Sequence, residues 1–129
     1  MTNTINIIAQ GFYGNRTGTS VKKDNIDRFI LGYIDEDMRV TEKIDRTIIP
    51  VSNTNNIVIV YNKYQEEDAI AYKEEVFNKE GYVLKPTVII SENNVELYSR
   101  CIVCRINDDG ELESLHDGDY RKFVEYLAE

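Results

Sequence analysis

Residues 57–70 read IVIVYNKYQEEDAI, and this stretch decides the fold class. Its first part, Ile57–Tyr61, is apolar without interruption and mostly β-branched, which is typical of a strand buried on both faces of a sheet. A helix should follow over roughly residues 66–80, because Ile70 and Phe77 lie seven residues apart on one helical face. A buried strand that leads directly into a helix predicts a sheet covered by helices.

Further strands are expected on both sides of this stretch. Six alternating or apolar segments have the required pattern: Ile5–Phe12, Arg28–Ile34, Val40–Val51, Tyr82–Ile90, Val95–Ile106 and Glu111–Leu115. The segment that contains Pro50 should lie near a sheet edge, because proline cannot donate to a ladder. The two segments on either side of residues 91–94 should form a hairpin.

A second helix is expected over residues 117–128. Tyr120, Phe123, Val124 and Leu127 recur at the spacing of one helical face, and Asp117 is placed to cap the first turn. With no internal repeat and no linker-like stretch, we predict a single domain over residues 1–129. Its fold class should be α+β: a mostly antiparallel sheet of about six strands with two helices.

Charge and composition narrow the classes of partner. The 129 residues carry 15 Lys and Arg against 23 Asp and Glu, a net charge of −8, and the basic residues are scattered. Such a chain is repelled by nucleic acids and by anionic membranes, so we expect neither as a direct partner. The N-terminal MTNTINIIAQ lacks the basic flank of a secretory signal, which predicts a cytoplasmic protein.

The motifs of common catalytic and metal sites are incomplete in this chain. Cys101 and Cys104 have the CxxC spacing of a redox pair. Within a strand, however, their side chains point to opposite faces, so we expect free thiols in the core. His116 is the single histidine. Residues 107–111 (NDDGE) resemble a calcium loop, yet Arg105 and His116 fall where the anchoring carboxylates belong, which leaves a hairpin turn. We expect no metal, no cofactor and no enzymatic activity.

One stretch has the composition of a phosphate-binding loop. Residues 13–20 read YGNRTGTS, in which glycines free backbone N–H groups, Thr17 and Thr19 add hydroxyl donors, and Arg16 supplies a planar fork of donors. The letters NRTGT are similar to the nucleotide-phosphate loop of thymidylate synthases, although nothing else in the chain matches that family. The alternative is a solvated hairpin loop built from turn-forming residues.

Two further arginines are candidate anion ligands. Arg100 and Arg105 flank the cysteine strand, and alternation places Arg100 with Ile102 on one face and Arg105 with Cys101 on the other. An arginine on an apolar face needs a partner, because a buried charge is costly unless it is paired. The partner can be an internal carboxylate, an acid of a neighbouring subunit or the phosphate of a ligand.

The chain also resembles two groups of phage and bacterial proteins. Its small size, its acidity and its abundance of isoleucine and asparagine are similar to those of small phage counter-defence proteins, such as the Thoeris anti-defence sponges. That resemblance implies a homo-oligomeric α+β protein that encloses a cyclic ADP-ribose-type signal or a cyclic oligonucleotide in the host cytoplasm. Locally, Gly32–Glu36 and Thr47–Pro50 resemble a stretch of the staphylococcal uracil-DNA glycosylase inhibitors, which mimic DNA with carboxylates.

Two functions of different classes are therefore expected from the sequence. In the first, the protein sequesters a nucleotide signal through five candidate ligand-binding residues: Arg16, Thr17, Thr19, Arg100 and Arg105. In the second, it presents an acidic face, with clusters at residues 35–37 and 108–113, to the basic site of a host enzyme that handles nucleic acid.

Overall fold

The computed structural model describes residues 3–11, 15–26, 30, 44–53, 55–80, 86–90 and 93–127, with side chains for all of these except 76–80. The elements of these segments, in chain order, are β1 (Thr4–Gln10), β2 (Arg16–Lys22), the 3₁₀ helix η1 (Lys23–Asn25), β3 (Arg46–Pro50), β4 (Ile57–Asn62), α2 (Lys63–Glu80), β5 (Val88–Ile90), β6 (Val95–Leu97), β7 (Cys101–Ile106), β8 (Leu112–Glu113) and α3 (Asp119–Tyr126).

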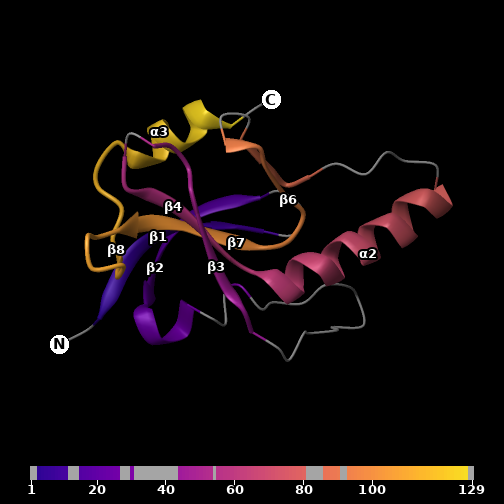
Figure 1. The fold of residues 1–129 in the computed structure, drawn as a ribbon, viewed down its shortest axis with the longest axis horizontal. Helices are drawn as coiled ribbons and strands as arrows, with labels where there is room; N and C mark the ends of the chain where they lie inside the picture. The colour runs from indigo at the N-terminus through magenta and orange to yellow at the C-terminus, as the bar shows by residue number, and fades with distance from the viewer. Residues whose placement is uncertain are drawn as a thin grey trace.

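An antiparallel sheet organises the chain (Figure 1). Its strand order is β2-β1-β7-β4-β3, with the short β8 paired to the end of β7, while β5 and β6 form a separate hairpin. The predicted α+β class, with an antiparallel sheet of about six strands and two helices, is confirmed. The edge position expected for the strand with Pro50 is confirmed as well, because β3 ends the sheet.

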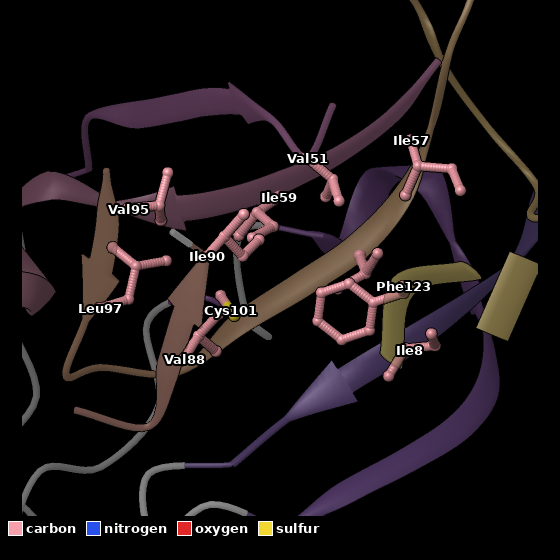
Figure 2. Packing of buried hydrophobic residues seen from close by; sticks show 11 residues of the cluster. Ile8, Val51, Ile57, Ile59, Val88, Ile90, Val95, Leu97, Cys101 and Phe123 are labelled. Atoms are coloured by element: carbon pink, nitrogen blue, oxygen red, sulfur yellow. The ribbon is translucent and has the colours of Figure 1, made fainter. Parts of the chain in front are cut away.

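One face of the sheet, here called the Ile8 face, carries the larger core. Phe123 of α3 is fully buried there and points into a cluster formed with the sheet and the β5–β6 hairpin (Figure 2). The labelled members of the cluster are Ile8, Val51, Ile57, Ile59, Val88, Ile90, Val95, Leu97, Cys101 and Phe123. Each fully buried aliphatic side chain contributes about 1.5–3 kcal/mol, so this cluster is a main source of stability.

The opposite face, here called the Ile7 face, is also buried. Ile5 and Ile7 of β1, Val60 of β4 and Ile102 of β7 pack there in one cluster with Ile26, which follows η1. Successive residues of a strand alternate between the two faces, so an uninterrupted apolar run serves a strand that is covered on both sides. The expectation for residues 57–61 is confirmed: four of the six β4 residues from Ile57 onward are buried in succession.

Helix α2 begins at Lys63, three residues before the predicted start, because β4 ends in a capping residue. The Asn62 side-chain oxygen accepts hydrogen bonds from the backbone N–H groups of Tyr64, at 3.2 Å, and Asp45, at 3.0 Å. An asparagine at this position satisfies donors of the first turn and fixes where the helix begins. From there α2 runs away from the sheet, and its C-terminal end lies farthest from the core (Figure 1).

The single strand expected over Val95–Ile106 is wrong, because it is divided between two sheets. β6 pairs with β5, and β7 lies in the centre of the main sheet. Between them, the carboxylate of Glu66 in α2 accepts hydrogen bonds from the backbone N–H groups of Tyr98 and Ser99 at 2.8–3.0 Å. These donors are therefore bound to a side chain, which ends one strand before the next begins.

Helix α3 is shorter than the predicted 117–128, and its buried face differs from the predicted one at Tyr120. Phe123 is fully buried and Leu127 packs against the core as predicted, but Tyr120 is 50% exposed and Asp119 is fully buried. The predicted cap is also wrong: Asp117 is exposed, and the N-cap is Gly118 at φ 88°, a conformation that glycine adopts without strain. The helix turns Asp119 inward because that carboxylate binds Arg105 of β7.

Three predicted strands fall partly outside the described residues. Of Arg28–Ile34 only Ile30 is described, and it is helical, so the strand is wrong at that residue. Of Val40–Val51 the structure describes residues 44–51, which contain β3, and of Tyr82–Ile90 it describes residues 86–90, which contain β5. Helix-face residues Val76 and Phe77 also lie outside the described side chains.

Candidate functional site

The segment expected to be a phosphate loop or a turn is for the most part a strand. Residues 16–20 belong to β2, an edge strand whose Thr17 lies opposite Ala9 of β1 and whose Thr19 lies opposite Ile7. Alternation therefore places both threonines on the Ile7 face. The composition of the segment suggested a loop because glycine and asparagine are common in turns, but pairing with β1 determines its conformation.

The connection between β1 and β2 packs the side chain of Asn15 directly against Gly11. The Gly11 N–H donates to the Asn15 carbonyl at 2.7 Å, and a Cβ at position 11 would overlap the side-chain amide of Asn15. No larger residue can occupy this position without moving Asn15. The close approach holds Asn15 beside the end of β1, next to the two threonines of β2.

Arg100 reaches the same place from a distant part of the sequence. It follows Tyr98 and Ser99, whose N–H groups are bound by Glu66, and it precedes Cys101, the first residue of β7. Cys101 pairs with Gln10 at the end of β1, which brings Arg100 beside the β1–β2 hairpin. Its position thus depends on a contact from α2 and on the register of three strands.

These elements enclose a pocket of about 250 Å³, here called the Arg100 pocket. Its lining consists of Ala9, Gln10, Gly11, Asn15, Thr17, Thr19, Arg100 and Cys101. Three of the five predicted ligand-binding residues, Thr17, Thr19 and Arg100, therefore come together. Arg16 does not line the pocket: it is exposed and lies opposite Gln10, whose side chain belongs to the other face.

The polar groups of the Arg100 pocket are available for binding. Within the part of the chain that the structure describes, the Arg100 guanidinium has no carboxylate partner, and the hydroxyls of Thr17 and Thr19 make no hydrogen bond. A guanidinium offers five donors and each hydroxyl offers one. The three side chains can therefore bind an oxyanion from two segments that are far apart in sequence.

Arg105 occupies the opposite situation. Its Nε and Nη2 atoms donate to the carboxylate of Asp119 at 2.6 and 3.0 Å, and the Asp119 side chain is fully buried. This hydrogen-bonded ion pair holds the pKa of Asp119 below its usual range and raises the pKa of Arg105. Of the alternatives expected for this arginine, the internal carboxylate is the one found.

The two cysteines are core residues, as the sequence predicts. Both are free and buried, with Cys101 in the cluster on the Ile8 face and Cys104 in the cluster on the Ile7 face. Desolvation raises the pKa of each thiol to about 12, which suppresses the nucleophilic thiolate at neutral pH. Alternation along β7 separates the sulfurs, so the CxxC spacing has no redox significance here.

The turn expected at residues 107–111 is confirmed. The turn joins β7 to β8, and in it the side-chain oxygen of Asn107 accepts hydrogen bonds from the backbone N–H groups of Asp109 and Glu111, both at 2.9 Å. His116 is exposed, and its backbone N–H donates a hydrogen bond to the carboxylate of Asp119. In the described segments, no cluster of three or more histidine, cysteine or acidic residues could hold a metal ion, and none of their helices could span a membrane.

Gln10 was missed by sequence reasoning. It is 1% exposed, and neither polar atom of its side-chain amide has a hydrogen-bond partner in the described segments. The signal lay in the alternation of β1, where position 10 shares the buried face of Ile8 and carries an amide in place of an aliphatic group. This amide can still donate and accept hydrogen bonds.

A second pocket, of about 440 Å³, also borders the Ile7 face. Lys23, Arg46 and Glu111 contribute charged groups to its lining, beside the apolar Ile26 and Leu112. It contains a carboxylate of its own, and Arg46 makes further interactions. The Arg100 pocket differs because none of its described lining residues is a carboxylate.

Comparison with known proteins returned no match: no family model, no curated protein and no solved structure is similar to this chain. The site is therefore judged on its own geometry.

Proposed function

We propose that this protein is a non-catalytic binding protein that sequesters a small phosphate-bearing nucleotide. The observation that carries the proposal is the Arg100 pocket, where an arginine without a carboxylate partner among the described residues meets Thr17 and Thr19. Charge-assisted hydrogen bonds from a guanidinium to phosphate are among the strongest polar contacts that a protein makes. The ligand phosphate would supply the partner that Arg100 lacks.

The chemistry of the lining favours binding over catalysis. Of the eight described lining residues only Arg100 and Cys101 carry ionisable side chains, and the pKa of the buried Cys101 thiol is about 12. General acid–base catalysis works best with a group whose pKa lies near the operating pH. The described lining can thus hold an anion but offers no group suited to moving a proton at neutral pH.

The size of the pocket limits how much of a nucleotide it holds. Pockets for whole drug-sized ligands span about 300–1,000 Å³, and the Arg100 pocket has about 250 Å³. We therefore infer that it takes the phosphate with its sugar and leaves the base outside. Self-association of the protein, as the resemblance to anti-defence sponges implies, would provide a surface for the base.

Isothermal titration calorimetry with a panel of cyclic nucleotides tests the proposal. We expect Arg100→Ala to abolish binding and the Thr17→Val/Thr19→Val double variant to weaken it. Arg16→Ala is the matched control, since it removes the same charge one residue from Thr17 but outside the pocket. Lys23→Ala controls for the second pocket. Absence of binding across the panel, or full binding by Arg100→Ala, would refute the proposal.

A second candidate function rests on the acidic surface. Asp108, Asp109, Glu111 and Glu113 are all exposed around the β7–β8 turn of a chain with net charge −8. Such a surface suits the basic site of an enzyme that handles nucleic acid; the cluster at residues 35–37 lies outside the described segments. The test is capture from host lysate at low and high salt, which should recover such an enzyme only at low salt.

A further inference from the structure

The charge balance of the Arg100 pocket restricts the ligand further. Among the described residues of its lining, Arg100 is the single cation and none is a carboxylate, while the other donors, the hydroxyls of Thr17 and Thr19 and the amide of Asn15, are neutral. Among these residues, Arg100 balances one negative charge of a bound anion. A second negative charge would find no second cation among them.

The surroundings of the pocket add to this restriction. The carboxylate of Glu66 accepts hydrogen bonds from the backbone N–H groups of Tyr98 and Ser99, and Glu66 is not among the described residues that line the pocket. The whole chain bears a net charge of −8, so its field disfavours each additional negative charge on a ligand. Both the local and the long-range terms favour a phosphate group that brings a single charge into the pocket.

The hydrogen-bonding groups also match a phosphodiester. Thr17 and Thr19 lie two residues apart on one face of β2, which separates them by about 7 Å along the strand. A phosphodiester has two unesterified oxygens and one charge. The two hydroxyls and the planar fork of Arg100 suffice to bind these two oxygens.

Building on the proposed function, we propose that the Arg100 pocket selects a phosphodiester over a terminal phosphate monoester or a pyrophosphate. The ligand is then a cyclic nucleotide whose phosphates are all diesters, in preference to one of the cyclic ADP-ribose type, which contains a pyrophosphate.

Calorimetry with two matched pairs of ligands tests the selection. The pairs are 3′,5′-cyclic AMP against 5′-AMP, and 3′,5′-cyclic GMP against 5′-GMP, so that each pair sets a diester against a monoester of the same nucleoside. At pH 8 we expect at least one diester to bind at least about tenfold more tightly than its partner, because a monoester carries nearly two charges there. ADP-ribose serves as the pyrophosphate probe and should bind as weakly as the monoesters.

A pH series from 8 to 5.5 provides an internal control. The second proton of a phosphate monoester binds near pH 6, so the monoester becomes singly charged as the pH falls and its affinity should approach that of the diester. The described lining contains no carboxylate or histidine that could titrate in this range, and the pKa of Cys101 is about 12. The affinity of the diester should stay constant.

The outcomes separate the two proposals. If 5′-AMP or ADP-ribose binds at pH 8 as tightly as the diesters, and Arg100→Ala abolishes that binding, the selection is refuted and the proposed function stands. If no probe binds, or if Arg100→Ala binds normally, both proposals fall. Retained affinity in Arg16→Ala, together with loss in Arg100→Ala, assigns the effect to the pocket and not to the charge of β2.

Discussion

Two arginines beside the same strand illustrate two uses of a positive charge. Arg105, near the end of β7, donates two hydrogen bonds to the buried carboxylate of Asp119. Arg100, directly before β7, lines a pocket with two threonine hydroxyls and, among its described residues, no carboxylate. The sequence presents both as arginines next to apolar residues; in the structure Arg105 forms an internal ion pair, and Arg100 has no carboxylate partner in the described segments.

The difference arises from what packs against each end of β7. Helix α3 covers the Ile8 face and places Asp119 against Arg105, 14 residues away in sequence. At the other end, β7 meets the β1–β2 hairpin, whose side chains on the Ile7 face are neutral. A charge in a protein interior needs a partner, so an arginine that has none is the better candidate for ligand binding.

The largest expected effect comes from breaking the internal pair. Asp119→Ala leaves Arg105, only 16% exposed in its side chain, without its carboxylate and also removes the acceptor of the His116 N–H. We expect the free energy of unfolding to fall by about 2–4 kcal/mol, somewhat less than for a fully enclosed pair. Urea denaturation at pH 7 measures the loss.

Two comparisons make that result specific. In Arg105→Met/Asp119→Leu both charges are removed, and most of the lost stability should return, because apolar replacement of a buried pair costs little. The low pKa of Asp119 also sets the pH dependence: its contribution is complete above the ordinary value of 3.8 and disappears as the pH falls through the lower folded value. A constant difference between wild type and Asp119→Ala down to pH 2 would contradict this account.

Lys73 of α2 is a third cation. Replacing it should change the free energy of unfolding by less than Asp119→Ala does, and in the opposite direction. It is 4% exposed, and desolvation lowers its pKa from 10.5 to about 8, although the charge of Glu66 acts the other way. Below pH 8 the lysine is charged in the folded and unfolded states, and the folded state bears the desolvation cost. Lys73→Met should therefore stabilise the protein at pH 7 by about 1–2 kcal/mol.

The pH dependence of that gain is the discriminating measurement. As the pH rises from 8 to 10.5, the folded state loses the Lys73 proton before the unfolded state does, so the wild type recovers stability and the advantage of Lys73→Met shrinks. Urea titrations at pH 7 and pH 10 follow this change. Lys63→Met, exposed at the start of the same helix, should show neither the gain nor its loss.

The smallest expected effect on stability belongs to Arg100. Arg100→Ala removes a side chain that has no ion pair among the described residues, so the free energy of unfolding should change by no more than about 0.5 kcal/mol. The same urea titration measures it beside Asp119→Ala. A loss as large as that of Asp119→Ala would show that Arg100 is a structural residue and would remove the contrast between the two arginines.

Much of the fold could be predicted from local patterns. The apolar run at residues 57–61, the helix that follows it, the edge strand with Pro50 and the turn at residues 107–111 all depend on neighbours in the chain. Predictions were wrong where a distant group intervened. Glu66 divides the strand expected over Val95–Ile106, and Arg105 turns α3 so that Asp119 is buried and Tyr120 exposed.

The candidate site was predictable in its residue types and not in its grouping. Thr17, Thr19 and Arg100 were expected to bind phosphate, but Arg16 was expected beside the threonines, in a loop. Because β2 is a strand, Arg16 and Thr17 point to opposite faces, and only the threonines line the pocket. Gln10 was missed because a single amide at the end of an apolar strand gives little signal in a sequence.

The sequence by itself determined the α+β class, several of the elements and the acidity of this protein, because hydrophobic periodicity, turn residues and charge are properties of short stretches. The tertiary structure decided which strands pair, and which of the two arginines has a carboxylate partner among the described residues. That choice depends on the register of β1 against β7 and on the side of the sheet that α3 covers, and these are set by packing between segments far apart in the chain.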